Sequence, residues 1–241
     1  MEMKRLAIIP ARGGSKRISN KNIRDFCGQP MITHVLGEAR ASGLFAKIHV
    51  STESETVRDV VARFGFAPDF SRPVELADDH TPIMPVLRHA AQEYVTRGEH
   101  FDEVWMLMAC APLIDAKDFV NAVTLFQQAG SQQPLLAVAE YPAPIEWAFS
   151  RDENGTLTPV QAGMFAERSQ DLTKCYFDAG SFAIFPAKRV LESEGAGTDT
   201  GFIGYPLPKG AAIDIDDEQD WRLAEALYRA KASARLLKDA P

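Results

Sequence analysis

The chain has few cysteines and no long apolar run, and each of these absences excludes some classes of protein. Its three cysteines, Cys27, Cys110 and Cys175, lie far apart in 241 residues. Because they form no C-x-x-C pair, they fit neither a disulfide framework nor a zinc site, and reduced thiols in the cytoplasm are the expectation. No stretch approaches the ~18–20 apolar residues of a membrane span. The short run Leu6–Ile9 stops at Pro10, so we expect neither a membrane segment nor a secretory signal.

A general excess of positive charge is also missing. Lysine and arginine number 26 against 33 acidic residues, which gives a net charge of −7. This balance argues against nucleic acid as a partner. Residues 12–24 depart from it, since they carry five cations and no acid: Arg12, Lys16, Arg17, Lys21 and Arg24. A cationic cluster in an acidic chain predicts a site for a small, highly charged anion, and a solvated basic loop is the alternative.

Strand and helix patterns alternate along the chain. Short apolar runs predict strands at 4–9, 47–51, 103–108, 135–139 and 181–185, with further candidates at 66–70 and 213–215. Amphipathic helical patterns lie between them. The alternation predicts an α/β fold, a mostly parallel sheet with helices on both faces. We expect one domain over 1–241, with an irregular or hairpin-rich insertion at about 141–178, where the periodicity is broken by Pro142, Pro144, Gly155 and Pro159.

Ligands of such folds bind at the carboxyl ends of the strands, so the loop after the first strand is a candidate site. It contains the adjacent glycines Gly13 and Gly14, whose backbone can approach a bulky anion. Arg12, Lys16 and Lys21 add charged donors for phosphate oxygens. The loop matches neither the Walker A pattern nor G-x-G-x-x-G, which argues against a dinucleotide-dependent dehydrogenase. A flexible basic turn is the alternative.

Two carboxylates near the end of the chain form a second candidate site. Asp214 and Asp216 are separated by one residue in an extended run, so both project to one face. They repel each other unless a cation lies between them, and Mg²⁺ prefers such oxygen ligands together with substrate phosphates. From the residues alone, capping of the following helix is the favoured alternative. Asp217 is predicted to be a cap in either case.

The glycine loop resembles the opening motif of the cytidylyltransferases that activate nonulosonic, sialic-acid-like sugars. The similarity covers nearly the whole chain and includes Ile9–Ile18 with Lys21–Ile23, Val50–Glu53, Arg72–Thr81 and Asp214–Trp221. Lys16–Ile18, Ala109–Leu113 and Phe177–Phe182 are most similar to the pseudaminic acid branch. The resemblance implies a Rossmann-like, three-layer, doubly wound fold of the nucleotide-diphospho-sugar transferase type. It also implies an enzyme that joins CTP and an acidic nine-carbon sugar into a CMP-sugar, with Mg²⁺ as the cofactor.

The resemblance also assigns roles to individual residues. The nucleotide would contact Ala11, Arg12, Gly13, Gly14, Ser15, Lys16, Lys21, Asn22, Arg72, Thr81 and Ala109. Arg12, Lys16 and Lys21 would hold the triphosphate, and Asn22 the nucleoside. Arg72 and Thr81 would belong to a second nucleotide-contacting loop. Arg12, Lys21, Asp214 and Asp216 would be catalytic, and the last two would bind the metal.

Several alternatives remain open at this stage. The sugar could instead be N-acetylneuraminate, legionaminate or 3-deoxy-octulosonate. Ser181 and Ala183 stand where the pseudaminic branch often has glutamine and tyrosine. A nucleotide-binding protein without turnover is the alternative from another class, although it would not need both Asp214 and Asp216. The resemblance further implies a cytoplasmic homodimer formed through the insertion, whose product would be used to glycosylate flagellin or another surface glycan.

Overall fold

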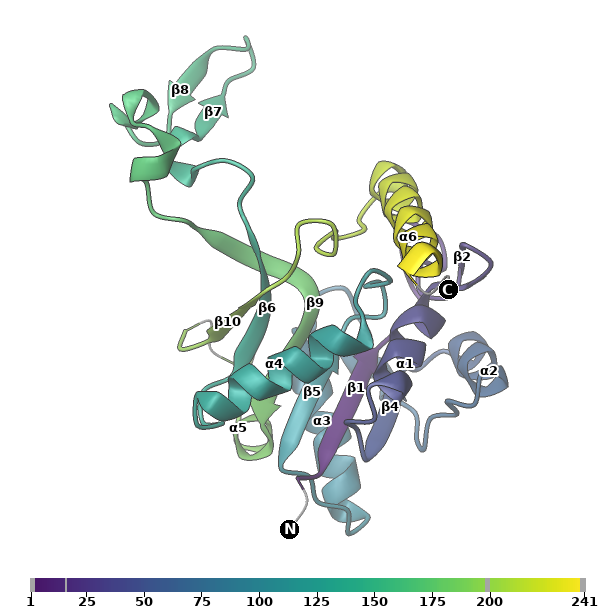
Figure 1. Ribbon diagram of the computed structural model, residues 1–241. Helices are drawn as coiled ribbons and strands as arrows, with labels where there is room; N and C mark the ends of the chain where they lie inside the picture. Colours follow the sequence, from purple (N-terminus) through teal and green to yellow (C-terminus); the bar gives the residue numbers. More distant parts are fainter. Residues whose placement is uncertain (1–2, 16, 198–199, 239–241) are drawn as a thin grey trace.

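A computed structural model describes residues 3–15, 17–197 and 200–238, with side chains described up to residue 234. Six strands of the described residues form the main sheet in the order β10-β6-β9-β5-β1-β4 (Figure 1). Their bounds are β1 Arg5–Pro10, β4 Lys47–Ser51, β5 Glu103–Leu107, β6 Leu135–Glu140, β9 Tyr176–Pro186 and β10 Ile203–Pro206. Strand β9 is antiparallel to both of its neighbours, and the other pairs are parallel. The predicted mostly parallel α/β fold is confirmed.

Helices cover both faces of this sheet and make three layers. Their bounds are α1 Met31–Ala41, α2 Glu55–Arg63, α3 Ile83–Thr96, α4 Ala116–Gln128, α5 Ala187–Leu191 and α6 Glu218–Lys238. Along β1, Ala7 and Ile9 pack with α1, α2 and α4, whereas Leu6 and Ile8 pack with α3 and α5. A strand buried on both faces needs a continuous apolar run, which the sequence of β1 provides.

A third apolar cluster joins the two ends of the chain. Helix α6 lies beside the small β2–β3 ribbon, Asp25–Phe26 and Gln29–Pro30, near the upper end of β1 in Figure 1. Trp221 and Ile215 are buried here against Ile18 and Phe26. The rings of Phe26 and Trp221 meet edge to face at 5.4 Å. This packing brings the residues just before α6 to the carboxyl end of β1.

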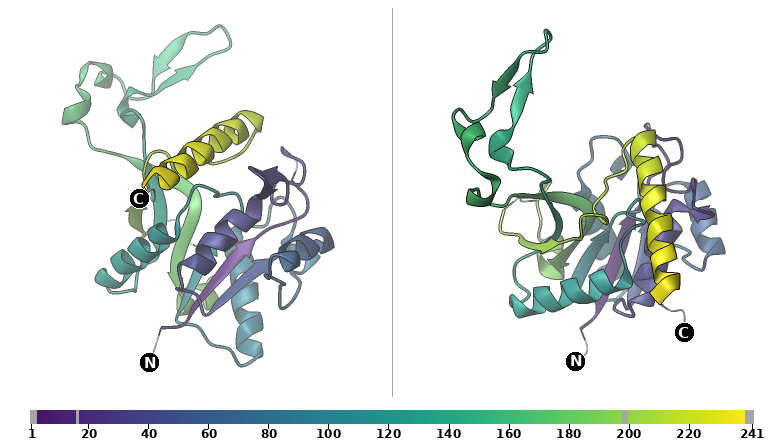
Figure 2. Two further views of the ribbon diagram at one scale, coloured as in Figure 1. Left: turned by 45° about the vertical axis from the view of Figure 1, so that its right-hand side comes forward. Right: turned by 45° about the horizontal axis from the view of Figure 1, so that its top comes forward.

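Residues 141–175 form an arm that projects away from the sheet in all views (Figures 1 and 2). The arm contains the hairpin of β7 Phe149–Arg151 and β8 Leu157–Pro159. Short 3-10 turns lie at Ile145–Trp147, Met164–Ala166 and Ser169–Asp171, and a fourth, Val74–Leu76, lies outside the arm. The long strands β6 and β9 lead into and out of it.

Two predicted strands are absent, and one strand of the main sheet was not predicted. Residues 66–70 are irregular: Pro68 cannot donate to a ladder, and Phe70 instead stacks on His49 with centroids 4.2 Å apart. Residues 213–215 are extended but pair with no strand among the described residues. Strand β10 was missed because Gly204 and Pro206 weaken its strand pattern. No helix among the described residues is long and apolar enough to cross a membrane.

Candidate active site

A cavity of about 340 Å³ opens beyond the carboxyl ends of β1 and β5. Eight of the predicted site residues line it: Arg12, Ser15, Lys21, Asn22, Arg72, Thr81, Ala109 and Asp214. They come from the loop after β1, the loop before α3, the loop after β5 and the segment before α6. The cavity therefore lies where an α/β sheet binds its ligands, and it contains residues from both predicted sites.

Five predicted residues do not line this cavity or cannot be placed. Ala11 is fully buried under the loop. Gly13, Gly14 and Asp216 lie beside the cavity residues in sequence without lining the cavity themselves. Lys16 lies outside the described residues.

Gly13 packs tightly against the end of β4. A Cβ atom at this position would lie 2.9 Å from the Ser54 Cβ, closer than side chains tolerate. The Gly13 N–H donates to Glu53 Oε1 at 2.7 Å. Gly14, in contrast, has nothing within 4 Å of its ideal Cβ position. Close packing against Ser54 thus explains why residue 13 is a glycine, whereas the described residues leave open space at Gly14.

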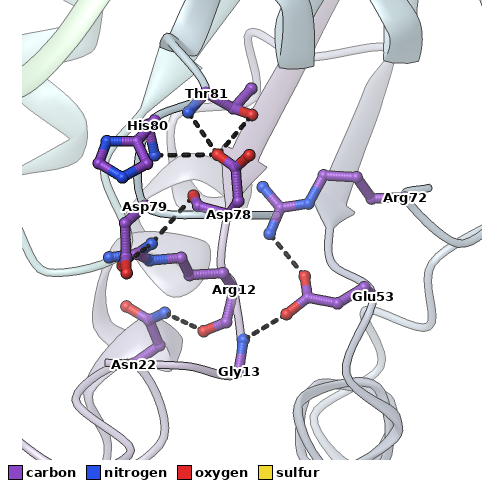
Figure 3. A network of polar contacts seen from close by, with 9 residues as sticks. All are labelled: Arg12, Gly13, Asn22, Glu53, Arg72, Asp78, Asp79, His80 and Thr81. Carbon is purple, nitrogen blue, oxygen red and sulfur yellow. Dashed lines mark hydrogen bonds and ion pairs between the residues drawn. The ribbon is translucent and has the colours of Figure 1, made fainter. Parts of the chain in front are cut away.

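Arg12 reaches across the cavity mouth to the loop before α3 (Figure 3). Its Nη1 donates to Asp79 Oδ1 at 2.6 Å and to the Asp78 carbonyl at 3.0 Å. The Asp78 carboxylate accepts from the Thr81 hydroxyl and from the N–H groups of His80 and Thr81, and these bonds lower its pKa. Since the Arg12 and Asp79 side chains are about one-third exposed, their ion pair is open to competition from a dissolved anion.

Arg72 is a buried cation in the cavity wall. Its side chain is only 4% exposed, and its Nη2 donates to Glu53 Oε2 at 2.6 Å. Its Nε has no hydrogen-bond partner among the described residues. Burial acts to raise the pKa of Glu53, but hydrogen bonds from Arg72 and the Gly13 N–H outweigh it, so the pKa is lowered. The charge of the Arg72 guanidinium is thus paired with that of Glu53, while its Nε donor forms no hydrogen bond within the described part of the chain.

Asn22 and Cys110 connect the glycine loop to the loop after β5. The Asn22 side chain donates to the Arg12 carbonyl at 3.0 Å, and its Oδ1 accepts from Cys110 Sγ at 3.2 Å. Burial raises the pKa of the Cys110 thiol to about 11. The thiol therefore stays protonated near neutral pH and lines the cavity rather than acting as a nucleophile.

The carboxylate pair lies beside the cations of the glycine loop. Asp214 lines the cavity, and Asp216 contacts Arg17 at 2.5 Å and Lys21 Nζ at 3.8 Å. Lys21 also donates to the carbonyl of the buried Ile215. Burial, followed by the charge of Asp216, raises the pKa of Asp214, whereas Lys21 opposes this shift.

This pair is not a complete metal site by itself. Within the described residues, no group of three or more histidine, cysteine or acidic side chains is arranged to hold a metal ion. A cation bound here would take further ligands from water or from a phosphate-bearing substrate. Asp217 has the predicted capping role, since its Oδ1 accepts from the N–H groups of Gln219 and Asp220 at 2.7 and 3.0 Å.

Glu53 and Gly180 are two residues at or beside the cavity that were not predicted as site residues. Glu53 lies two residues after the end of β4, in the stretch Val50–Glu53 that contributes to the family resemblance. Gly180 lines the cavity within β9, with a positive φ of 57°. A Cβ at Gly180 would lie 3.5 Å from the Asp214 Cγ, an ordinary van der Waals distance, so the positive φ rather than a lack of space favours glycine here.

Comparisons with known proteins all identify similarity to enzymes that transfer a cytidylyl group or make CMP-sugars. The family model described as "Cytidylyltransferase" matches residues 6–133. A pseudaminic acid cytidylyltransferase of Campylobacter jejuni is 36% identical over 94% of this chain and 97% of its own length. A CMP-N,N'-diacetyllegionaminic acid synthase of the same species is 32% identical over 94% and 95%. Among solved structures, a CMP:2-keto-3-deoxy-manno-octonic acid synthetase complexed with CTP has a TM-score of 0.68 at 17% identity, covering 95% of this chain and 99% of that chain.

Proposed function

This chain belongs to the cytidylyltransferase family of nonulosonic acid activators, and from that premise we propose that it joins CTP to pseudaminic acid. The products would be CMP-pseudaminic acid and pyrophosphate, formed in the cytoplasm. The observation that carries this proposal is the shared cavity, which is lined by the glycine-loop residues Arg12 and Lys21 and by Asp214. Binding a nucleoside triphosphate and promoting the attack of a hydroxyl on it require cations and carboxylates in one cavity.

In the proposed reaction, the anomeric hydroxyl of the sugar acid attacks the α-phosphorus of CTP. A bond forms between that oxygen and phosphorus, the bond to the pyrophosphate oxygen breaks, and the proton of the hydroxyl passes to water. Arg12 and Lys21 would bind phosphate oxygens and oppose the charge of the leaving pyrophosphate. Arg72 and Thr81 would contact the nucleoside side from the opposite wall. Most of the catalysis would thus come from positioning and from charge stabilisation.

Asp214 and Asp216 fit the proposed Mg²⁺ ion chemically. The pKa of Asp214 is raised partly by the charge of Asp216, as expected of two carboxylates that a cation would relieve. Hard carboxylate oxygens combined with substrate phosphates are the usual ligands of Mg²⁺. When bound, the ion would neutralise charge on the α-phosphate and polarise it.

The choice of sugar is the finer part of the proposal. The 36% identity to the pseudaminic acid enzyme favours pseudaminic acid, and the 32% identity to the legionaminic acid synthase makes legionaminate the main alternative. Ser181 and Ala183, whose types differ from those common in the pseudaminic branch, are both buried within β9 and line no part of the cavity. Their identity is therefore a weak guide to the sugar.

We also propose that the arm pairs two copies of the chain. It exposes large apolar side chains, with Leu157 57%, Val160 64% and Phe165 69% exposed. A groove at its base is lined by Tyr141, Ile145 and Val160 among others. Apolar surface of this kind is costly in a monomer and is typical of a protein interface.

Pyrophosphate release from CTP tests the proposed function. The purified protein is incubated with CTP, Mg²⁺ and, in separate reactions, pseudaminic acid, N,N'-diacetyllegionaminic acid, N-acetylneuraminate and 3-deoxy-octulosonate. We expect the highest kcat/KM with pseudaminic acid and loss of activity when Mg²⁺ is removed. A higher kcat/KM with another acid would reassign the sugar. CTP binding without turnover of any acid would favour the nucleotide-binding protein instead.

A further inference from the structure

The end of β4 contacts both loops that face the cavity. The Ser51 carbonyl accepts from the Ala11 N–H, and the Thr52 carbonyl accepts from the Arg72 N–H, each at 2.9 Å. Beyond these backbone bonds, the Glu53 side chain extends between the same two loops (Figure 3). Residues 51–53 therefore form one support for two loops that are about 60 residues apart in the chain.

Glu53 makes one hydrogen bond to each loop. Oε1 accepts from the Gly13 N–H at 2.7 Å, and Oε2 accepts from Arg72 Nη2 at 2.6 Å. The Glu53 side chain is 17% exposed and that of Arg72 4%, so solvent screens this pair weakly. Because the carboxylate is short and both of its oxygens are engaged, it sets the separation of the two loops.

The surroundings of Glu53 show that this arrangement is close-packed. A Cβ on Gly13 would lie 2.9 Å from the Ser54 Cβ and 3.5 Å from Glu53 Oε1, so only glycine lets the loop approach this near. Arg72 is left with an Nε that has no partner among the described residues, although the residue lines the cavity. Glu53 therefore pairs with one part of the guanidinium, and the buried Nε is left without a hydrogen bond to any described residue.

We propose that Glu53 is a positioning residue for the nucleotide. It holds the glycine loop and the Arg72 guanidinium at a fixed separation, so that the triphosphate and the nucleoside meet their donors already in place. This inference rests on the proposed function, because it takes CTP as the occupant of the cavity. Glu53 itself does not line the cavity and acts through Gly13 and Arg72.

The central test compares Glu53→Gln with the control Asp59→Asn. Both changes turn a carboxylate into an amide: Glu53 lies just before α2, whereas Asp59 lies in the middle of this helix and is exposed to solvent. We expect Glu53→Gln to raise the KM for CTP by roughly ten- to a hundred-fold, because a charged hydrogen bond to Arg72 is lost. The kcat should change much less, and Asp59→Asn should match the wild type in both.

A second readout needs neither CTP nor a sugar. Amide hydrogen exchange of the free protein should become faster in residues 10–15 of Glu53→Gln, and it should remain unchanged in residues 10–15 of Asp59→Asn. Gly13→Ala provides an independent variant, since it pushes the loop away from Ser54 without changing any charge. It should also raise the KM for CTP and speed exchange in this segment.

The outcomes separate this inference from the proposed function. If the wild type releases pyrophosphate and Glu53→Gln keeps the wild-type KM for CTP, Glu53 does not position the nucleotide. Unchanged exchange in residues 10–15 of Glu53→Gln would also overturn the inference. If the wild type turns over no sugar acid, the proposed function fails, and the exchange experiment still reports on whether Glu53 holds the loop.

Discussion

At the scale of single residues, neighbouring aspartates in the segment that precedes α6 have different roles. Asp214 faces the cavity, and Asp217 caps the helix. The sequence predicted the cap because an acid at a helix start has a local physical reason. It could not predict the bonds of Glu53 to Gly13 and Arg72, which join residues 40 and 19 positions apart. Such pairings depend on how strands assemble and leave no spacing signal.

Replacing the two aspartates separately tests this division of tasks. Asp214→Asn should lower kcat by roughly a hundred-fold or more, because it removes a carboxylate proposed to hold the Mg²⁺ ion that would neutralise charge on the α-phosphate. Asp217→Asn should keep the activity and change the free energy of unfolding by at most about 0.5 kcal/mol, since asparagine also caps helices. Pyrophosphate release across a Mg²⁺ titration, together with urea unfolding, measures both. Equal turnover in the two variants would contradict the assignment.

His49 gives the protein a dependence of stability on pH. Burial lowers the pKa of its imidazole from 6.5 to about 4, and neither ring nitrogen has a hydrogen-bond partner among the described residues. Between these values the unfolded chain binds a proton that the folded protein excludes. Stability contributed by the neutral ring is therefore complete above pH 6.5 and falls by about 3 kcal/mol as the pH decreases to 4.

His49→Phe keeps an aromatic ring against Phe70 and removes the titration. Urea unfolding of both proteins from pH 7 to pH 4 should show a smaller loss of stability in the variant. The comparison is made between the two proteins because acidic groups titrate in the same range in each of them. Parallel stability curves would show that His49 does not contribute.

At the scale of elements, the sequence predicts best where burial and local pattern agree. Strand β1 and helices α3 and α4 follow their apolar patterns. The expectation of a strand at 213–215 was wrong, yet Ile215 is buried and Asp214 faces the cavity, as the alternation required. The segment is held by Lys21 and by the packing of α6 rather than by a neighbouring strand. The alternation of residue types in this segment therefore predicted which way its side chains point, but it did not predict which elements the segment packs against.

The anchoring of α6 should affect both stability and activity. Trp221 is 3% exposed, packs on Phe26 and lies under the Arg24 guanidinium at 4.5 Å. Trp221→Ala should lower the free energy of unfolding by roughly 3–5 kcal/mol. It should also raise the KM for CTP, because Asp214 and Ile215 precede this helix. Leu223→Ala, at a position 53% exposed, is the control and should change stability by less than about 0.5 kcal/mol.

The molecule as a whole consists of a three-layer body and a projecting arm (Figure 2). Alternation of strands and helices predicted the body, and the fold similarity to a solved structure at a TM-score of 0.68 supports it. The loss of periodicity after residue 140 marked where the arm begins. It could not indicate that this segment projects away from the sheet, because neither a hairpin nor its 3-10 turns follow a regular apolar repeat. The partner of the arm stays a prediction.

Charge placed on the arm should separate the proposed dimer. Val160→Glu introduces an acid at a side chain that is 64% exposed and lines the groove at the base of the arm. Light scattering should give the mass of a dimer for the wild type and of a monomer for this variant. Leu223→Glu, on exposed α6, is the control and should remain dimeric. A monomeric wild type would refute the proposed pairing.

The meeting of the first loop with the segment before α6 has a consequence during protein synthesis. Lys21 and Ile215 are bonded although 194 positions separate them in the chain. Ribosomes release the amino-terminal part first, at about 5–20 residues per second. A basic loop without its carboxylate partners therefore precedes them by roughly ten to forty seconds. Chains that end before Asp214 would therefore carry the basic loop without the acidic residue that contacts Lys21.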